Sequence, residues 1–280
     1  MSENRPSLAL TSHLPPGPGV CAAFGASGVP VPLPGGQGSS WRVGDLVIKA
    51  GGVGMEELRW QETVFATLAR DGFRVAPPSR AHDGSLLVEG WCARAWLPGG
   101  HELRRWHDIV EAGERFHAAL ASTRRPGLLD RRTDHWAVGD RVAWGELPAG
   151  SFAGVKHVSR LVAALRPVAA RSQLIHGDLT GNVLFAAGLP PAIIDFSPYW
   201  RPAGFAAAIV VGDALVWEGA DAELLASFAG EPDFGQFLLR ALIYRAVTDR
   251  LARVDEPVRP DDADPFLPVV ELACRFARDS

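Results

Sequence analysis

A short polar loop and the end of an apolar strand contain the residue types that could do chemistry. The first extends from His176 to Asn182 and includes Asp178; the second, at residues 193–196, includes Asp195. Carboxylate and carboxamide oxygens suit a hard cation such as Mg²⁺, and two protein oxygens with substrate phosphates form a usual ligand set. If Asn182 and Asp195 share such an ion, Asp178 remains for a separate chemical task.

The apolar residues around these runs predict the strands that would position them. Segments 183–185 and 192–196 have the composition of two strands, and Gly188 with two prolines marks the turn between them. A turn centred on Gly188 and its successor would set Asn182 opposite Asp195, at a Cβ separation of about 4.5–5.5 Å. Asp and Asn beside turns often serve only the local backbone, so neither run alone would indicate a site. The two together do.

The pattern His-Gly-Asp-x-x-x-x-Asn followed by Ile-Asp-Phe resembles the catalytic segment of the aminoglycoside phosphotransferase family, within the protein-kinase-like superfamily, in an actinobacterial-type member of unknown substrate. The resemblance implies that Asp178 orients or deprotonates the acceptor hydroxyl, and that Asn182 and Asp195 bind the Mg²⁺ ions on the phosphates of ATP or GTP. Gly177 replaces the protein-kinase Arg that answers an activation-loop phosphate, which favours the small-molecule branch. Ser197 departs from the Gly that ends Asp-Phe-Gly.

A glycine-rich segment upstream predicts a cover for nucleotide phosphates. Gly36, Gly38 and Ser39 lie between two strand-like segments, and the second segment leads into Lys49. Glycines allow backbone amides to approach phosphates closely. The resemblance implies that Lys49 contacts the α- and β-phosphates; the alternative is a solvated lysine at a strand end.

A helix is predicted over residues 56–70, because apolar residues recur at helical spacing. Glu62 lies within this apolar stripe, and a buried charge is costly unless it is paired. We therefore expect Glu62 to pair with Lys49, as the family's helix glutamate does. Glu56 and Glu57 are instead typical of a first helical turn, where the helix dipole favours acidic side chains.

Two more strand-like runs follow at residues 86–89 and 92–97. The segment from residue 94 to 99 resembles the connection between the lobes in the family. The resemblance implies that the backbone of Ala95 and Trp96 hydrogen-bonds the purine, with the Trp96 side chain more suited to packing than to recognition.

Helical periodicity dominates beyond Pro98. His117 lies beside an apolar stripe and is expected to be structural, whereas His176 is expected to brace the catalytic loop by hydrogen bonds. Asp213 resembles the family's aspartate that ties its helix back to that loop. An acidic stretch at residues 255–264 suits either a cationic substrate or, more commonly, solvated surface.

Composition restricts the partners and the compartment. The formal net charge of −4 gives no electrostatic case for nucleic acid or an anionic membrane. The reducing cytoplasm is favoured by three observations. The three cysteines are widely spaced, no leader pattern is present, and the apolar run 205–217 is too short to span a bilayer. We expect a monomer or homodimer that binds a nucleotide and a small-molecule hydroxyl acceptor.

The predicted fold is α+β and two-lobed, like that of the protein kinases. A flexible arm (1–20) precedes an N-lobe with a small antiparallel sheet (21–96) and a mainly helical C-lobe (97–280). The predicted enzyme is an ATP- or GTP-dependent phosphotransferase, with Mg²⁺, acting on a hydroxyl of an amino sugar, an aminoglycoside-like compound or another small metabolite. The alternatives are a kinase fold without turnover, a metallohydrolase using His176, Asp178 and Asp195, and a protein kinase.

Overall fold

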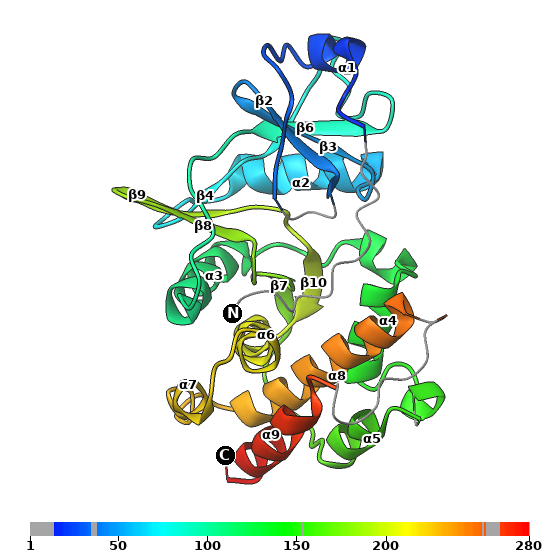
Figure 1. The fold of residues 1–280 in the computed structure, drawn as a ribbon, viewed down its shortest axis with the longest axis vertical. Coiled ribbons are helices and arrows are strands. Elements are labelled where there is room, and N and C mark those ends of the chain that lie inside the picture. The colour runs from blue at the N-terminus through cyan, green and yellow to red at the C-terminus, as the bar shows by residue number, and fades with distance from the viewer. Residues whose placement is uncertain (1–13, 35–37, 153, 254, 256–263, 280) are drawn as a thin grey trace. The chain divides into compact units, whose positions relative to one another are not determined.

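The computed structural model describes residues 14–34, 38–152, 154–253, 255 and 264–279, arranged in two compact units (Figure 1). The first unit comprises residues 1–102 and 181–195, and the second comprises residues 103–180 and 196–280. The predicted metal-binding segment at 181–195 therefore belongs to the first unit, although the sequence-based division placed it in the second lobe.

An antiparallel sheet forms the centre of the first unit. Its strands, in spatial order, are β1 (Val31–Pro32), β2 (Ser40–Val43), β3 (Leu46–Ala50), β6 (Trp91–Ala95) and β5 (Pro78–Ser79). Val43 pairs with Leu46 across a two-residue turn in which Gly44 has φ +59°. A Cβ at Gly44 would lie 2.6 Å from the Ser27 carbonyl oxygen, so both its conformation and its surroundings require glycine. Lys49 lies near the end of β3, the second strand of this tight β2–β3 hairpin.

Two α-helices belong to the part of the first unit that the structure describes. In α1 (Pro18–Ala23), Val20 is buried in one apolar cluster with Val43 and Ile48 of the sheet. The predicted arm over residues 1–20 is therefore wrong at its end, because α1 is anchored by burial, while residues 1–13 lie outside the described residues. α2 (Met55–Thr67) confirms the helix predicted over residues 56–70.

A second, three-stranded sheet attaches residues 181–195 to the first unit. β9 (Leu189–Ile193) pairs antiparallel with β8 (Val183–Ala186) and parallel with β4 (Arg74–Val75). Gly100 and Phe185 also exchange backbone hydrogen bonds of 2.9 Å. These bonds explain why the hairpin clusters with the first unit. The strand predicted at 86–89 is absent, because Val88 and Trp91 close a tight turn in which Glu89 and Gly90 have positive φ.

The second unit is mainly helical. Its α-helices are α3 (Trp106–Leu120), α4 (His135–Ala143), α5 (Lys156–Ala163), α6 (Ala203–Trp217), α7 (Ala222–Ala226), α8 (Phe234–Ala252) and α9 (Leu267–Asp279), with 3₁₀ turns η2 (Gly127–Arg131) and η3 (Ala149–Phe152). α8 packs against α4, α5, α6 and α9. α6 is buried from Phe205 to Leu215, as expected for a helix that is apolar on all sides.

Two short strands complete the second unit. β7 (Gln173–His176) and β10 (Pro198–Arg201) pair antiparallel, with His176 opposite Pro198. β10 thus pairs with the strand that leads into the catalytic run. Within the described part of the chain, none of the helices combines the length and apolar character required to cross a bilayer.

Candidate active site

The β8–β9 hairpin fixes the backbone around the predicted metal ligands. Val183 pairs with Ile193, and the Ile194 N–H donates to the Asn182 carbonyl oxygen at 3.0 Å. Asn182 is therefore opposite Ile194, so the predicted register, with Asn182 opposite Asp195, is wrong by one residue.

The turn lies one residue earlier than predicted, which by itself would shift the partner of Asn182 by two residues. Ala186 pairs with Leu189, which leaves only Ala187 and Gly188 in the turn, with Gly188 at φ +71°. Two-residue turns with Gly at a positive φ suit the twist of a β-hairpin. An irregularity between Leu184 and Ala186 shifts the pairing back by one residue, so the net error is one residue. Neither feature follows from the apolar pattern that predicted the strands.

Asp195 occupies an uncommon backbone conformation directly after β9. Its φ of +48° lies in the left-handed region, which non-glycine residues rarely adopt and Asp tolerates better than most. The strand has ended at Ile193, so strand alternation no longer dictates the direction of the Asp195 side chain. Such conformations concentrate at functional sites.

The structure brings Asp195 together with Lys49. Lys49 Nζ donates to Asp195 Oδ2 at 2.8 Å, and the two side chains remain 25% and 34% exposed. Two residues predicted for adjoining tasks, phosphate contact and metal binding, thus form one ion pair within the first unit. Because both groups are still partly accessible, the pair can reorganise around a bound ligand.

The predicted pairing of Glu62 with Lys49 is wrong. The Glu62 carboxylate instead accepts hydrogen bonds from Arg80 Nε and Nη2 at 2.7 and 2.5 Å, at the partly exposed edge of α2. The polar residue that α2 buries completely is Gln61. Gln61 accepts from Arg94 and donates to Glu57 Oε1 at 2.9 Å. A neutral amide is cheaper to bury than a carboxylate, which accounts for the difference.

The donor set at Asn182 and Asp195 fits a hard divalent cation. A carboxamide and a carboxylate supply oxygen ligands, and nucleotide phosphates would supply others. Among residues 14–34, 38–152, 154–253, 255 and 264–279, no cluster of three His, Cys, Asp or Glu side chains could hold a metal ion by itself. The metallohydrolase alternative therefore finds no ligand cluster in the described parts of the chain.

The glycine-rich turn is only partly described. Gly36 lies outside the described residues, whereas Gly38 has φ +73° and Ser39 is buried. The Ala50 N–H donates to the Ser39 carbonyl oxygen at 3.0 Å, and Ser40 pairs with Lys49. The described end of this turn is thus hydrogen-bonded to the strand that carries Lys49.

The predicted purine-binding segment makes contacts within its own unit. Ala95 pairs with Leu46, and the Trp96 N–H donates to the Asp45 carbonyl oxygen at 2.7 Å. The guanidinium of Arg42 lies 4.5 Å from the centroid of the Trp96 ring. The Trp96 side chain therefore packs, as expected, and its N–H already has an acceptor.

In the second unit, two histidines form the base of the catalytic loop. His176 is fully buried, its N–H donates to His117 Nε2 at 3.0 Å, and its Nδ1 accepts from the Asp178 N–H at 3.1 Å. Burial and the neighbouring His176 lower the pKa of His117 to about 3. His117 is thus a neutral acceptor, and a chain of two imidazoles supports the backbone of Asp178.

The ring of Tyr199 leaves no space for a side chain at residue 177. A Cβ at Gly177 would lie 2.3 Å from Tyr199 Cδ2, far inside any permitted contact. The Gly177 N–H donates to the Ser197 carbonyl oxygen at 3.0 Å, and the Tyr199 hydroxyl lies 3.1 Å from that of Tyr244. Gly177, which replaces the Arg of protein kinases, is therefore also required by the packing of Tyr199.

Arg245, which sequence reasoning missed, contacts Asp178 directly. Its Nη2 donates to Asp178 Oδ1 at 2.7 Å, and its Nε and Nη2 donate to the two Asp213 oxygens at 2.8 and 2.6 Å. Asp213, predicted to tie its helix to the catalytic loop, is thus linked to Asp178 through Arg245. An arginine within the apolar run of α8 was an available signal, because a buried charge needs a partner.

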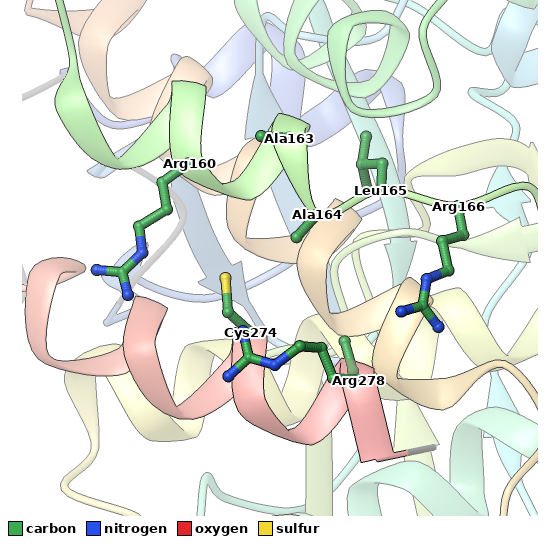
Figure 2. A pocket seen from close by; sticks show the side chains of 8 residues that line it. Arg160, Ala163, Ala164, Leu165, Arg166, Cys274 and Arg278 are labelled. Carbon is green, nitrogen blue, oxygen red and sulfur yellow. The ribbon is translucent and has the colours of Figure 1, made fainter.

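A surface cavity of about 390 Å³ lies in the second unit between α5 and α9 (Figure 2). Ala163, Ala164, Leu165 and Ala277 line it together with Arg160, Arg166, Arg278 and Cys274. No predicted site residue contributes to this cavity, so it is distinct from the candidate active site.

Comparison with known proteins decides the family. A profile described as the phosphotransferase enzyme family matches residues 31–199, more than half of the 280-residue chain. The chain belongs to this phosphotransferase family. The match covers Lys49, Asn182 and Asp195, predicted to bind phosphate or metal, and Asp178, predicted to act on the acceptor hydroxyl. No curated protein matches the sequence.

Solved structures share the fold at low sequence identity. An aminoglycoside phosphotransferase from Alicyclobacillus acidocaldarius has a TM-score of 0.57 and 14% identity, over 95% of each chain. Amicoumacin kinase hAmiN, in complex with AMP-PNP, Ca²⁺ and Ami, has a TM-score of 0.56 and 12% identity, over 89% of this chain and 87% of its own. A thermostable mutant of aminoglycoside phosphotransferase APH(4)-Ia, in complex with ADP and hygromycin B, has a TM-score of 0.54 and 14% identity, over 93% of this chain and 97% of its own. The predicted kinase-like fold is confirmed.

Proposed function

We propose that this chain transfers the γ-phosphoryl group of ATP or GTP to a hydroxyl of an amino sugar, an aminoglycoside-like compound or another small metabolite. The observation that carries the proposal is the 2.8 Å ion pair between Lys49 and Asp195, which joins residues 146 positions apart in the chain. A lysine beside a carboxylate, with Asn182 on the same hairpin, supplies one cation and two oxygen ligands for nucleotide phosphates. The complexes of similar proteins with ADP or with AMP-PNP and Ca²⁺ support this interpretation.

Each residue has a proposed task. Lys49 would bind phosphate oxygens, the glycine-rich turn predicted at Gly36, Gly38 and Ser39 would offer backbone amides to them, and the backbone near Ala95 and Trp96 would serve the purine. Asn182 and Asp195 would hold Mg²⁺, which when bound neutralises charge on the β- and γ-phosphates. Glu62 has no part in this arrangement, because Arg80 binds it.

Asp178 acts on the acceptor. Its carboxylate orients the acceptor hydroxyl and takes its proton as the oxygen–phosphorus bond forms and the bond to the β–γ bridging oxygen breaks. His176 supports this residue from the backbone side, and the reaction depends chiefly on positioning and charge stabilisation. The proposed setting is the cytoplasm, with the protein as a monomer or homodimer.

An acceptor screen tests the proposal. Wild-type protein with Mg·ATP is assayed for ADP release against a library of aminoglycosides, other amino sugars, nucleosides and amino alcohols, and the phosphorylated product is identified by mass spectrometry. Asp178→Ala serves as the control, and we expect it to lose about 10²–10⁴-fold in turnover while retaining nucleotide binding. An Asp178→Ala protein that transfers phosphate at the wild-type rate would disprove the assignment.

A second measurement separates transfer from binding alone. Thermal stabilisation by Mg·ATP is compared with that by Mg·GTP, which also resolves the nucleotide preference. Stabilisation without turnover across the library would favour the alternative of a kinase fold that binds nucleotide without catalysis.

A further inference from the structure

We propose that Arg245 of α8 is a positioning residue that sets the orientation of the Asp178 carboxylate for phosphoryl transfer. This inference rests on the proposed function of Asp178 and goes beyond it, because it assigns a task to a residue far along the chain. Arg245 Nη2 donates to Asp178 Oδ1 at 2.7 Å. The hydrogen bond fixes one carboxylate oxygen and thereby limits rotation of the other.

Asp213 holds the guanidinium in place. Two hydrogen bonds, Nε to Oδ1 at 2.8 Å and Nη2 to Oδ2 at 2.6 Å, join Arg245 to Asp213 of α6 in the fork geometry that arginine makes with carboxylates. The Asp213 and Arg245 side chains are 3% and 8% exposed, whereas the Asp178 side chain is 35% exposed. The triad thus has a buried anchor and one accessible end, which is the end proposed to do chemistry.

Aromatic rings restrict the guanidinium further. Its central carbon lies 5.1 Å from the centroid of the Tyr244 ring and 5.7 Å from that of Trp136. The Tyr244 hydroxyl meets that of Tyr199, whose ring packs against Gly177. The walls around Arg245 therefore also contact the catalytic loop, so that Arg245 and Asp178 are held by one packed assembly.

Charge balance explains why simple deletion of Arg245 would be uninformative. Burial raises the pKa of Asp213, and Arg245 opposes that rise by stabilising the ionised carboxylate. Removing Arg245 alone leaves a buried carboxylate without its cation, which destabilises a fold strongly. The test needs variants that leave no uncompensated buried charge.

The experiment uses the full chain and three variants. Arg245→Lys keeps the charge but loses the two-pronged geometry. The double variant Arg245→Met/Asp213→Asn removes the pair without leaving an ionised partner. Arg240→Met is the matched control, because Arg240 lies in the same helix, is 7% exposed like Arg245, and bonds to the carbonyl oxygens of Gln236 and Arg166.

The readouts are acceptor-independent Mg·ATP hydrolysis, transfer to the best acceptor found in the screen, and thermal stabilisation by Mg·ATP. We expect the double variant to lose about 10–100-fold in kcat, since a displacement of about 1 Å can cost about 10²-fold. KM for ATP should change less than about threefold, and Arg245→Lys should recover part of the loss. Arg240→Met should retain the wild-type kcat even if its melting temperature falls as far as that of the double variant.

A double-mutant cycle shows whether Arg245 acts through Asp178. In an Asp178→Asn background, Arg245→Met/Asp213→Asn should cause no further loss of the residual hydrolysis rate. A full additional loss in that background, or wild-type kcat in the double variant, would overturn the positioning role while leaving the proposed function intact. Failure of the wild-type protein to turn over or bind Mg·ATP would overturn both.

Discussion

The two units hold their proposed chemical groups in different ways. In the first, Lys49 and Asp195 form a two-member pair with a quarter to a third of each side chain exposed. In the second, Asp178 is the accessible end of a buried triad with Arg245 and Asp213. Exchanging the partners of a partly exposed ion pair changes the free energy little, whereas disrupting a buried triad destabilises the fold strongly. Under the proposed function, nucleotide phosphates would contact groups that can rearrange, and the acceptor would contact a carboxylate that is held in place.

The largest expected effect tests the exchangeable pair. Asp195→Ala should reduce kcat/KM for Mg·ATP by at least about 10²-fold, because it removes a proposed metal ligand and the partner of Lys49 together. Its melting temperature without nucleotide should remain close to that of the wild type, since the pair is partly exposed. Isothermal titration with Mg·ATP and thermal unfolding measure the two quantities. A large loss of stability without nucleotide would contradict the comparison.

The next effect concerns the packed side of the comparison. Gly177→Ala should destabilise the protein by about 2–3 kcal/mol, because the added Cβ would lie 2.3 Å from Tyr199 Cδ2 and overpacking has costs of this order. Chemical unfolding measures the change. Gly127→Ala is the control, because a Cβ there meets nothing within 4 Å. Adding Tyr199→Leu should restore part of the lost stability; equal stability of the two glycine variants would refute the packing explanation.

A pH series examines the imidazole pair beneath Asp178. Folded His117 stays neutral down to a pKa of about 3, whereas an unfolded histidine binds a proton below about pH 6.5. The unfolded state therefore binds more protons between these values, and stability falls as the pH falls, by about 2 kcal/mol at pH 5. Urea unfolding at pH 7.5 and pH 5 measures this loss.

Substitution identifies the group responsible for the pH dependence. His117→Gln should flatten the stability profile over that pH interval, whereas His135→Gln, at an exposed position, should leave the slope unchanged. An unchanged slope in His117→Gln would place the titration elsewhere.

The smallest effect is expected at α2. Glu62→Gln should leave turnover and nucleotide affinity unchanged and cost less than about 1 kcal/mol of stability, because Glu62 forms its ion pair with the half-exposed Arg80. Steady-state kinetics and thermal unfolding measure both. Arg80→Gln should behave in the same way. A marked rise in KM for ATP with Glu62→Gln alone would restore the role that the family resemblance implied.

The sequence was most informative where the chemistry is local. Asp178, Asn182 and Asp195 lie in two short runs. The apolar residues beside them predicted the first strand, β8, but the second, predicted at 192–196, lies at 189–193. The predicted register was wrong by one residue, because it depends on the position of the turn at Ala187 and Gly188 and on the irregularity between Leu184 and Ala186, neither of which periodicity reports.

Long-range partners were harder to predict. Glu62 and Gln61 are adjacent on α2 and point about 100° apart, so the direction in which the helix faces its unit decides which of them is buried. Arg245 binds Asp178 across 67 residues, a pairing that local patterns in the sequence do not encode. Its burial was suggested by its apolar neighbours, but its partners depend on how α6 and α8 pack.

The close contact between Gly177 and Tyr199 has an evolutionary consequence. Protein kinases carry at this position an arginine that answers a phosphate on the activation segment. In this chain the aromatic ring already fills that space. A single codon change to arginine would damage the fold before it could confer regulation, so Tyr199 would have to be replaced first. The Tyr199 ring thus prevents a single substitution at residue 177 from introducing the arginine on which regulation by phosphorylation depends.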